Sequence, residues 1–150
     1  ERRNTEPYAL ALRHKHVPEM TAYSGTTIDP LFTPAVGHYY QGMLVQVPLF
    51  TRSLRANTSL EQVHGLLAER YADEAFIGVH EVGAEGYLEG GFLNATACNN
   101  TNHLEIMVFG HSEQMLLVAR YDNLGKGASG AAVQNLNLMI GSNETTGLVT

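Results

Sequence analysis

The stretch that most constrains this chain runs from Tyr121 to Asn135. An apolar run ends there, and three glycines follow within six residues. Glycine lets a backbone turn tightly or approach a ligand closely. The stretch therefore predicts the end of a strand, a glycine-rich turn and then a helix. We expect that helix to run from about Ser129 to Ile140 and to end at Gly141, since glycine commonly terminates helices.

Composition limits the classes of protein that remain. The chain has 150 residues, 44% of them apolar and 16% charged, which is typical of one globular domain. The formal net charge is -6, and only nine Lys and Arg are scattered along the chain. This balance argues against a nucleic-acid partner or an anionic membrane surface. The single cysteine, Cys98, rules out an internal disulfide and fits a cytoplasmic location. No apolar run approaches the ~20 residues of a membrane span.

Apolar runs bounded by Gly, Pro and Asp predict several strands. We expect them at Tyr8–Arg13, Ile28–Thr33, Met43–Phe50, Phe76–His80, Leu104–Phe109 and Met115–Tyr121, the last two as a hairpin. Pro48 predicts an edge position or a bulge for its strand, because proline cannot donate to a ladder. The pattern is that of an α+β fold, with a mixed, mainly antiparallel sheet and helices on one face. No strand precedes a G-x-G-x-x-G turn, so no dinucleotide-binding domain is expected within these residues.

Two helices are expected before the glycine-rich stretch. Pro18, with the acidic residue after it, is typical of a helix start. Asn57 or Thr58 is expected to cap a second helix that runs to about Tyr71. Ser59 and the glutamine three residues later also resemble a capping box at that helix start.

A cluster of polar side chains lies at the start of the first of these helices. His14 and His16 are one residue apart, and Glu19 follows within reach of the second imidazole. A histidine can accept or donate a proton near neutral pH, and a carboxylate can orient its ring. Taken alone, the cluster is also compatible with surface histidines. A metal site is not expected, because no further ligands occur at the usual spacing.

These two stretches resemble the N-acetyl-gamma-glutamyl-phosphate reductases, which use NADP in arginine biosynthesis and belong to the glyceraldehyde-3-phosphate and aspartate-semialdehyde dehydrogenase-like superfamily. That family carries patterns close to D-N-L-x-K-G-A-x-G-x-A-V-Q-N-x-N-L and H-R-H-x-P-E. This chain matches the first pattern closely from Asp122 to Leu138. It matches the second from His14 to Glu19, except that Lys15 replaces the arginine. A lysine would bind a carboxylate or phosphate less rigidly than an arginine.

The resemblance implies roles for six residues. His16 would be the acid or base that handles protons around the thioester and aldehyde, supported by His14 and Glu19. The turn with Asn123, Lys126 and Gly127 would lie near the nicotinamide of NADP, whose carboxamide Asn123 would hold. In this family a cysteine thiolate attacks the acyl phosphate and NADPH then delivers hydride. The resemblance places that cysteine and most of the NADP-binding surface in a preceding domain, outside this chain.

The middle of the chain matches the family less closely. The family reads F-x-P-H-L and then R-G-I, whereas Ala35 here replaces the histidine and Gln41 replaces the arginine. An arginine beside a phosphorylated substrate is an obvious phosphate ligand, so these changes leave substrate identity open. The stretch from Asn100 to Ile106 resembles G-T-N-x-C-x-I and is expected to be scaffold. Cys98 lacks a neighbouring base and is expected to be a buried or incidental thiol, not the nucleophile.

Residues 1–150 are thus expected to form the substrate-binding and dimerisation domain of such a reductase. Its last helix, residues 129–141, would pack on the missing NADP-binding domain. The expected partners are a small-molecule substrate, the chain's own N-terminal NADP-binding domain, and further copies in a homodimer or homotetramer. The isolated chain would be inactive. Two alternatives remain open: a related semialdehyde dehydrogenase with another acyl-phosphate substrate, and a non-enzymatic association module.

Overall fold

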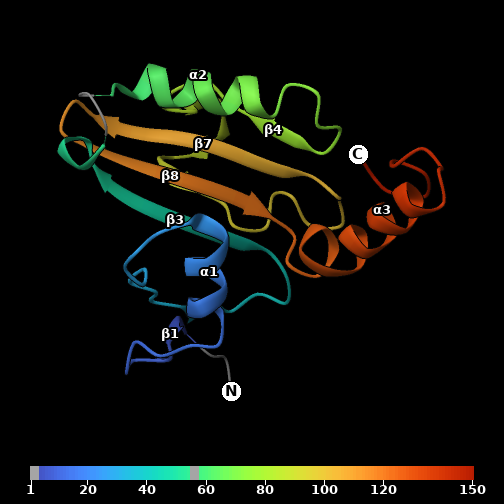
Figure 1. Ribbon diagram of the computed structural model, residues 1–150, viewed down its shortest axis with the longest axis horizontal. Helices are drawn as coiled ribbons and strands as arrows, with labels where there is room; N and C mark the ends of the chain where they lie inside the picture. The colour runs from blue at the N-terminus through green and yellow to red at the C-terminus, as the bar shows by residue number, and fades with distance from the viewer. Residues whose placement is uncertain (1–3, 55–57) are drawn as a thin grey trace. The chain divides into compact units, whose positions relative to one another are not determined.

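The computed structural model describes residues 4–54 and 58–150. The chain divides into two compact units, with the boundary between Tyr40 and Gln41 (Figure 1). Each unit contains one part of the predicted site. Within the described ranges, no helix combines the length and apolar character needed to cross a membrane.

The larger unit is built on a four-stranded sheet with the order β3-β8-β7-β4 (Figure 1). The strands are β3 (Met43–Phe50), β4 (Ile77–Val79), β7 (Leu104–His111) and β8 (Gln114–Tyr121). β3 pairs antiparallel with β8, which forms an antiparallel hairpin with β7, whereas β4 pairs parallel with β7. The expected mixed, mainly antiparallel sheet is therefore confirmed. β3 is an edge strand, as its proline predicted.

Helix α2 (Leu60–Arg70) packs on one face of this sheet. Ser59 caps it: its hydroxyl accepts from the Gln62 backbone N–H at 3.3 Å, and the Gln62 side chain accepts from the Ser59 N–H at 2.8 Å. The predicted capping box is therefore confirmed, and Thr58 is not the cap. Asn57, the other cap considered, lies outside the described residues. Leu60 anchors the helix in a core with Val108 of β7 and Met115 of β8.

The opposite face of the sheet is covered by the irregular segment between β4 and β7. This segment contains a 3₁₀ turn (η3, Glu85–Tyr87) and two short antiparallel strands, β5 (Leu88–Glu89) and β6 (Phe92–Leu93). The fully buried Ala84 packs here on Met107 and Val118, and Leu93 lies against the same cluster. The sheet is therefore covered by a helix on one face and by a folded loop on the other.

The glycine-rich stretch forms a π-helical turn, η4 (Gly125–Ser129), which leads directly into helix α3 (Gly130–Met139). The helix begins and ends within one residue of its predicted limits. Gly141 follows it with a φ of 72°, a left-handed conformation that glycine adopts without strain. The larger unit also contains a short 3₁₀ turn, η1 (Thr51–Ser53), directly after β3.

The smaller unit holds helix α1 (His16–Ser24) and a two-stranded antiparallel ladder of β1 (Glu6–Pro7) and β2 (Ala35–Val36). Two predicted strands are wrong here. The run from Tyr8 to Arg13 is a turn, because Ala9 and Leu12 take φ values of 52° and 57° and the Leu12 N–H donates to the Ala9 carbonyl. The run from Ile28 to Thr33 is irregular, and the strand comes two residues later. Apolar composition suggested strands, but no neighbouring ladder was available to pair with these runs.

Candidate functional site

The histidine cluster lies at the start of α1 in the smaller unit. His16 is the first residue of the helix and Glu19 lies one turn on, so both side chains share a helix face. The His16 Nδ1 atom is 2.8 Å from Glu19 Oε2. Both side chains are open to solvent, with 49% and 64% of their surface exposed. The structure therefore brings together the two residues that sequence spacing suggested, at a surface that a substrate can reach.

The hydrogen bonds assign the protons on both imidazoles. An ionised carboxylate can only accept, so His16 must donate from Nδ1, which leaves Nε2 with its lone pair in the neutral ring. The backbone N–H of His16 donates to His14 Nδ1 at 3.2 Å, so His14 carries its proton on Nε2. The His14 ring lies 4.8 Å from the His16 ring and 5.1 Å from Phe32. The neutral His16 ring thus presents a lone pair at Nε2, and aromatic contacts hold His14 beside it.

The second group of predicted site residues lies in the turn after β8, within the larger unit. Asp122 is 2% exposed and its carboxylate accepts four hydrogen bonds. Oδ1 accepts from the backbone N–H groups of Leu124 and Gly125, at 2.8 and 3.0 Å. Oδ2 accepts from the Asn100 N–H at 2.8 Å and from Gln41 Nε2 at 2.9 Å. One buried carboxylate therefore ties two distant segments of the chain, around Gln41 and Asn100, to the start of η4.

These contacts decide the charge of Asp122. Burial alone would raise its pKa, but the backbone N–H groups of Asn100, Gly125 and Leu124 outweigh burial and hold the pKa below its ordinary value. The side chain is therefore ionised at neutral pH.

Replacement of Asp122 by Asn should destabilise the protein by about 2–4 kcal/mol, because an NH₂ group would then face two buried donors. The native pKa is depressed, so the carboxylate's stabilisation is complete above the unfolded pKa of about 3.9 and is lost as the pH falls through the native pKa. The stability difference between wild type and variant should shrink below about pH 4. Urea unfolding at a series of pH values measures this. Asp73→Asn, at an exposed site, is the control, and a difference independent of pH would contradict the expectation.

Asn123, the residue after Asp122, is partly exposed. Its Oδ1 accepts from the Gly42 N–H at 2.7 Å. Gly42 has a φ of 112°, and a Cβ there would lie 2.5 Å from the Ala95 carbonyl oxygen. Only glycine fits this close approach, which fixes the backbone that holds Asn123. Among the described residues, the Asn123 amide nitrogen makes no hydrogen bond.

Lys126 and Gly127, the other two residues expected at the cofactor, play visible structural roles. Lys126 Nζ donates to Gln134 at 2.7 Å and lies 5.4 Å from the centre of the Phe76 ring. Burial lowers the Lys126 pKa, an effect partly offset by nearby glutamates. The Gly127 N–H donates to the Asp122 carbonyl at 2.9 Å and closes the turn. The ammonium in this arrangement is engaged inside the larger unit.

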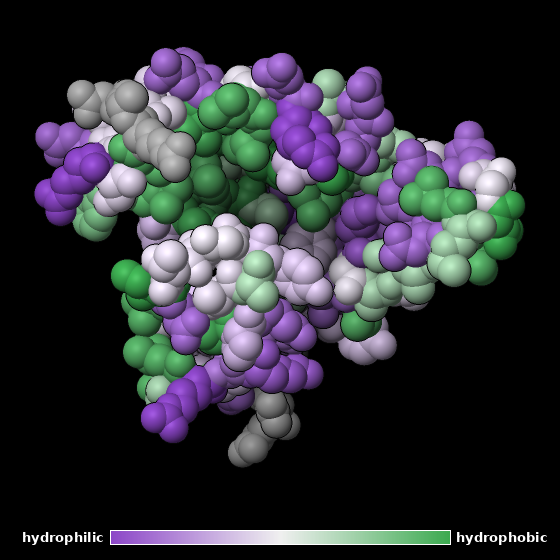
Figure 2. Space-filling model, in the orientation of Figure 1, coloured by the Kyte–Doolittle hydropathy of each residue, from purple (hydrophilic) through white to green (hydrophobic). Residues whose placement is uncertain are grey.

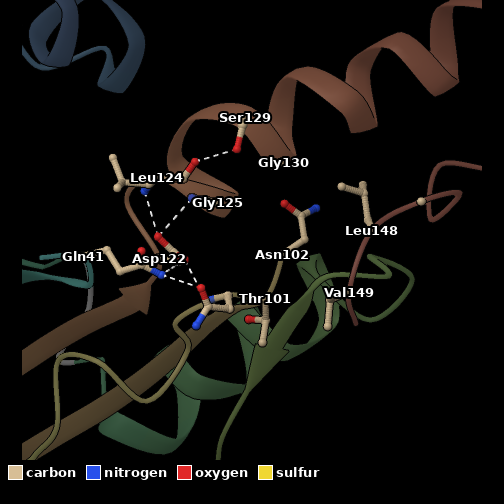
Figure 3. A pocket seen from close by; sticks show the side chains of 12 residues that line it. Gln41, Thr101, Asn102, Asp122, Leu124, Gly125, Ser129, Gly130, Leu148 and Val149 are labelled. Atoms are coloured by element: carbon tan, nitrogen blue, oxygen red, sulfur yellow. Dashed lines mark hydrogen bonds between the residues drawn. The ribbon is translucent and has the colours of Figure 1, made fainter.

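A polar pocket of about 380 Å³ opens between η4, the start of α3 and the C-terminal segment (Figure 3). Asn102 lies in it between Gly130 and Leu148, and its Oδ1 has no hydrogen-bond partner among the described atoms. A Cβ on Gly130 would collide with that oxygen, so this glycine is required by packing. Sequence reasoning assigned Asn102 to scaffold and did not find the pocket. No sequence signal indicated the pocket, because its walls come from segments that are far apart in the sequence, including the C-terminal segment.

The two departures from the family pattern fall in different places. Ala35 lies exposed in β2 of the smaller unit. Gln41, which stands where the family has arginine, turns inward and donates from one nitrogen to Asp122 and to Asn100, both at 2.9 Å. In this geometry the side chain at position 41 donates a hydrogen bond to a buried carboxylate. Sequence reasoning considered it only as a phosphate ligand, and missed Asp122 as its partner.

Cys98 is 5% exposed, as the sequence predicted. Its thiol donates to Glu105 Oε2 at 3.0 Å. Burial, followed by the adjacent Glu105 carboxylate, raises the Cys98 pKa to about 12. The thiolate, which is the reactive form, is therefore scarce at neutral pH.

Alkylation of Cys98 by iodoacetamide near pH 8 should be about a thousandfold slower in the native protein than in urea, since reaction needs an exposed thiolate. Mass spectrometry of the labelled peptide would measure both rates. Native labelling within about tenfold of the denatured rate would contradict the buried, protonated thiol.

Comparison with known proteins adds an independent line of argument. Residues 1–123 match the family described as semialdehyde dehydrogenase, dimerisation domain. A protein of Nostoc sp. (strain PCC 7120) named N-acetyl-gamma-glutamyl-phosphate reductase 2 is 51% identical over 144 residues, which cover 94% of this chain and 45% of the relative. The reductases so named in Burkholderia lata and Brucella suis are 47% and 44% identical, each over 43% of its own length.

The chain thus spans less than half the length of these relatives. The family match includes the histidine cluster and ends at Asn123, before Lys126 and Gly127. It agrees with the mixed, mainly antiparallel sheet and with the motifs identified from the sequence. The chain belongs to the family of semialdehyde dehydrogenase dimerisation domains.

Proposed function

We propose that this chain is the substrate-binding and dimerisation part of an NADP-dependent N-acetyl-gamma-glutamyl-phosphate reductase. Such an enzyme would convert N-acetyl-gamma-glutamyl phosphate to N-acetylglutamate semialdehyde and phosphate in arginine biosynthesis, in the cytoplasm. The observation that carries the proposal is the His16–Glu19 pair at 2.8 Å, which leaves a basic imidazole nitrogen directed away from the carboxylate. The names of relatives at 44–51% identity support the substrate.

His16 would handle the proton in this reaction. Its Nε2 can accept a proton when neutral and return it once the ring is charged, and the hydrogen bond to Glu19 keeps the ring oriented. Hydride addition to the acyl carbonyl would place negative charge on its oxygen, and a protonated His16 could stabilise that charge until the thiolate leaves and the aldehyde forms. His14 would keep the ring in place through its contact with the His16 backbone. NADPH supplies the hydride when bound.

The turn after β8 fits a nicotinamide. Asn123 presents an amide NH₂ with no partner among the described residues, and such a group can donate to a carboxamide oxygen. Gly127 leaves the backbone exposed beside it. Lys126 is held by Gln134 and would contact the cofactor only after leaving that partner.

Exposed apolar side chains indicate covered surfaces in the whole protein. On α3 and directly after it, Leu136, Met139 and Ile140 are 54%, 83% and 68% exposed, which favours packing against the NADP-binding domain. On β3, Val45 and Val47 are 41% and 45% exposed on the face that also carries α2. Figure 2 shows hydrophobic side chains gathered beside that helix. A second copy of the chain would cover them in a homodimer or homotetramer.

The test is phosphate-dependent reduction of NADP by the full-length gene product with N-acetylglutamate semialdehyde. Activity with this substrate and with NADP, compared with aspartate semialdehyde and with NAD, is the expected result. The isolated residues 1–150 should show no turnover in the same assay. Preference for another semialdehyde would favour a related dehydrogenase, and absence of any turnover by the full-length protein would favour an association module.

A further inference from the structure

We propose that Tyr8 and Phe32 are positioning residues that act on His16. Their rings hold the His14 imidazole in the place where it caps helix α1, and this cap fixes the backbone that carries His16. The inference rests on the proposed function, since it takes His16 as the acid–base group. It gives His14 a task at its Nδ1 atom, within the protein, and not at the substrate.

Helix α1 begins without a side-chain cap from its capping residue. Lys15 occupies that position, and its side chain makes no capping hydrogen bond. The first N–H groups of a helix have no partner within the helix, so other groups must satisfy them. The Nδ1 atom of His14 accepts from the His16 N–H at 3.2 Å, and the His14 carbonyl accepts from the Val17 N–H at 3.0 Å. His14 therefore satisfies the start of the helix that carries the proposed base.

The cap requires one orientation of the His14 ring. Only an unprotonated Nδ1 can accept from a backbone N–H, so the ring must be neutral with its proton on Nε2. Half a turn of the ring would place a carbon where Nδ1 now lies, and the bond would be lost. The torsion that turns an imidazole is broad and roughly two-fold, so the side chain alone does not select this orientation. Neighbouring side chains must select it.

Two aromatic rings lie against His14. The Tyr8 ring meets it edge-on, with 5.8 Å between the ring centroids and 66° between the ring planes. The Phe32 ring lies 5.1 Å from it at an angle of 60°. Aromatic rings attract each other at such distances and angles, because the positive edge of one approaches the negative face of the other. The two rings therefore restrict the His14 ring from two separate segments of the chain.

The fold of the smaller unit brings these rings together. The β1–β2 ladder continues with a bond from the Tyr8 N–H to the Pro34 carbonyl at 3.0 Å, and Phe32 lies two residues before that carbonyl. The left-handed turn after Tyr8 then reverses the chain, so that His14 returns to the side of Tyr8. This gives a role to the turn that stands where the sequence predicted a strand.

The first test asks which nitrogen of His14 is used. The side-chain amide of asparagine reaches the position of Nδ1, whereas that of glutamine reaches the position of Nε2. In the full-length protein, His14→Asn should keep kcat of phosphate-dependent NADP reduction within about threefold of wild type, because its amide oxygen can accept from the His16 N–H. His14→Gln should lower kcat at least about tenfold. Equal activity of the two variants, or the reverse order, would overturn the inference.

A double-mutant cycle tests the path from Phe32 to His16. Phe32→Leu keeps apolar bulk but removes the ring, and should lower kcat about three- to tenfold with the KM of the semialdehyde within about twofold of wild type. Phe32→Tyr keeps the ring and should keep kcat within about twofold of wild type. In the His16→Asn protein, Phe32→Leu should cause no further loss, because it acts through the residue that has already been removed.

The same comparison applies to Tyr8, with Tyr8→Leu in place of Phe32→Leu and Tyr8→Phe as the variant that keeps the ring. Tyr23→Leu is the matched control, since Tyr23 is an aromatic residue of α1 that is 92% exposed.

An equal loss of kcat from Phe32→Leu with and without His16 would show a general structural effect and would overturn the positioning role. Wild-type kcat in both leucine variants would also overturn it, and would leave the proposed reductase standing. Absence of reductase activity in the wild type would overturn both.

Nuclear magnetic resonance reads the His14 ring directly and does not depend on activity. Histidine labelled with ¹⁵N in the full-length protein reports which nitrogen of each ring is protonated, and the His14→Asn spectrum identifies the His14 signals. We expect one neutral form in the wild type, with the proton on Nε2, and a mixture of both neutral forms in Phe32→Leu. A proton on Nδ1 in the wild type, or an unchanged His14 spectrum in Phe32→Leu, would overturn the inference.

Discussion

Replacement of His16 by Asn in the full-length protein is expected to lower kcat by a factor of about 10²–10⁴, the usual contribution of a positioned acid–base group. Asparagine keeps a polar side chain of similar reach but cannot exchange a proton at neutral pH. The KM of the semialdehyde should change little, because the lost interaction belongs to the transition state. Steady-state assays of phosphate-dependent NADP reduction give both constants.

Glu19→Gln should have a smaller effect, about tenfold, because a carboxamide can still accept from His16 Nδ1 and orient the ring, although more weakly than a carboxylate. His111→Asn is the matched control, since His111 is an exposed histidine at the β7–β8 hairpin. Full activity in His16→Asn would remove this residue from the mechanism. The role of acid or base would then pass to another group, and the argument from the His16–Glu19 pair would fail.

Replacement of Glu105 by Gln is expected to destabilise the protein by about 3–5 kcal/mol, because it leaves the buried guanidinium of Arg120 without a counter-charge. Arg120 Nε lies 2.6 Å from Glu105 Oε2, and the arginine side chain is 4% exposed. The other carboxylate oxygen bonds His80 at 3.1 Å. Burial tends to raise the Glu105 pKa, but the bonds from Arg120, Cys98 and His80 outweigh burial and lower it.

The same network holds the loop between β4 and β7, which covers the face of the sheet opposite α2. Arg120 also donates to the Asn94 carbonyl at 3.1 Å, and the His80 ring stacks on Tyr87 at 3.7 Å between centroids. Loss of the charge at Glu105 should therefore loosen residues 80–99 first. Urea unfolding gives the free energy, and amide hydrogen exchange reports the loop. Glu81→Gln, at an exposed site, is the control. A Glu105→Gln protein as stable as this control would show that the ion pair contributes no net stability.

Local patterns in the larger unit predicted its elements well. β3 has the bounds that its apolar run indicated, and the capping box at Ser59 is present. These features depend on neighbours within a few residues. The two strands wrongly predicted in the smaller unit would have needed neighbouring strands to pair with. Tyr8–Arg13 has the composition of a strand, yet left-handed φ values at Ala9 and Leu12 turn the chain, so no ladder can run through it.

The candidate site shows the same division. The spacing of His16 and Glu19 on one helical turn was enough to predict their contact, because helix geometry fixes which side chains meet. Nothing in the spacing of Gln41 and Asp122 indicated that they touch, since 81 positions separate them. Their contact arises only when β3 pairs beside β8 and brings the start of one strand to the end of the other.

The sequence by itself determined the family, the α+β class, the limits of the last helix and the histidine–glutamate pair, all of which rest on motifs or on contacts within one helical turn. The tertiary structure decided the inward turn of Gln41, the buried charges of Asp122 and Glu105, the raised Cys98 pKa and the bond from Gly42 to the Asn123 side chain. The physical reason is that these properties depend on burial and on donors from distant segments. A chain acquires such neighbours only when its sheet has formed.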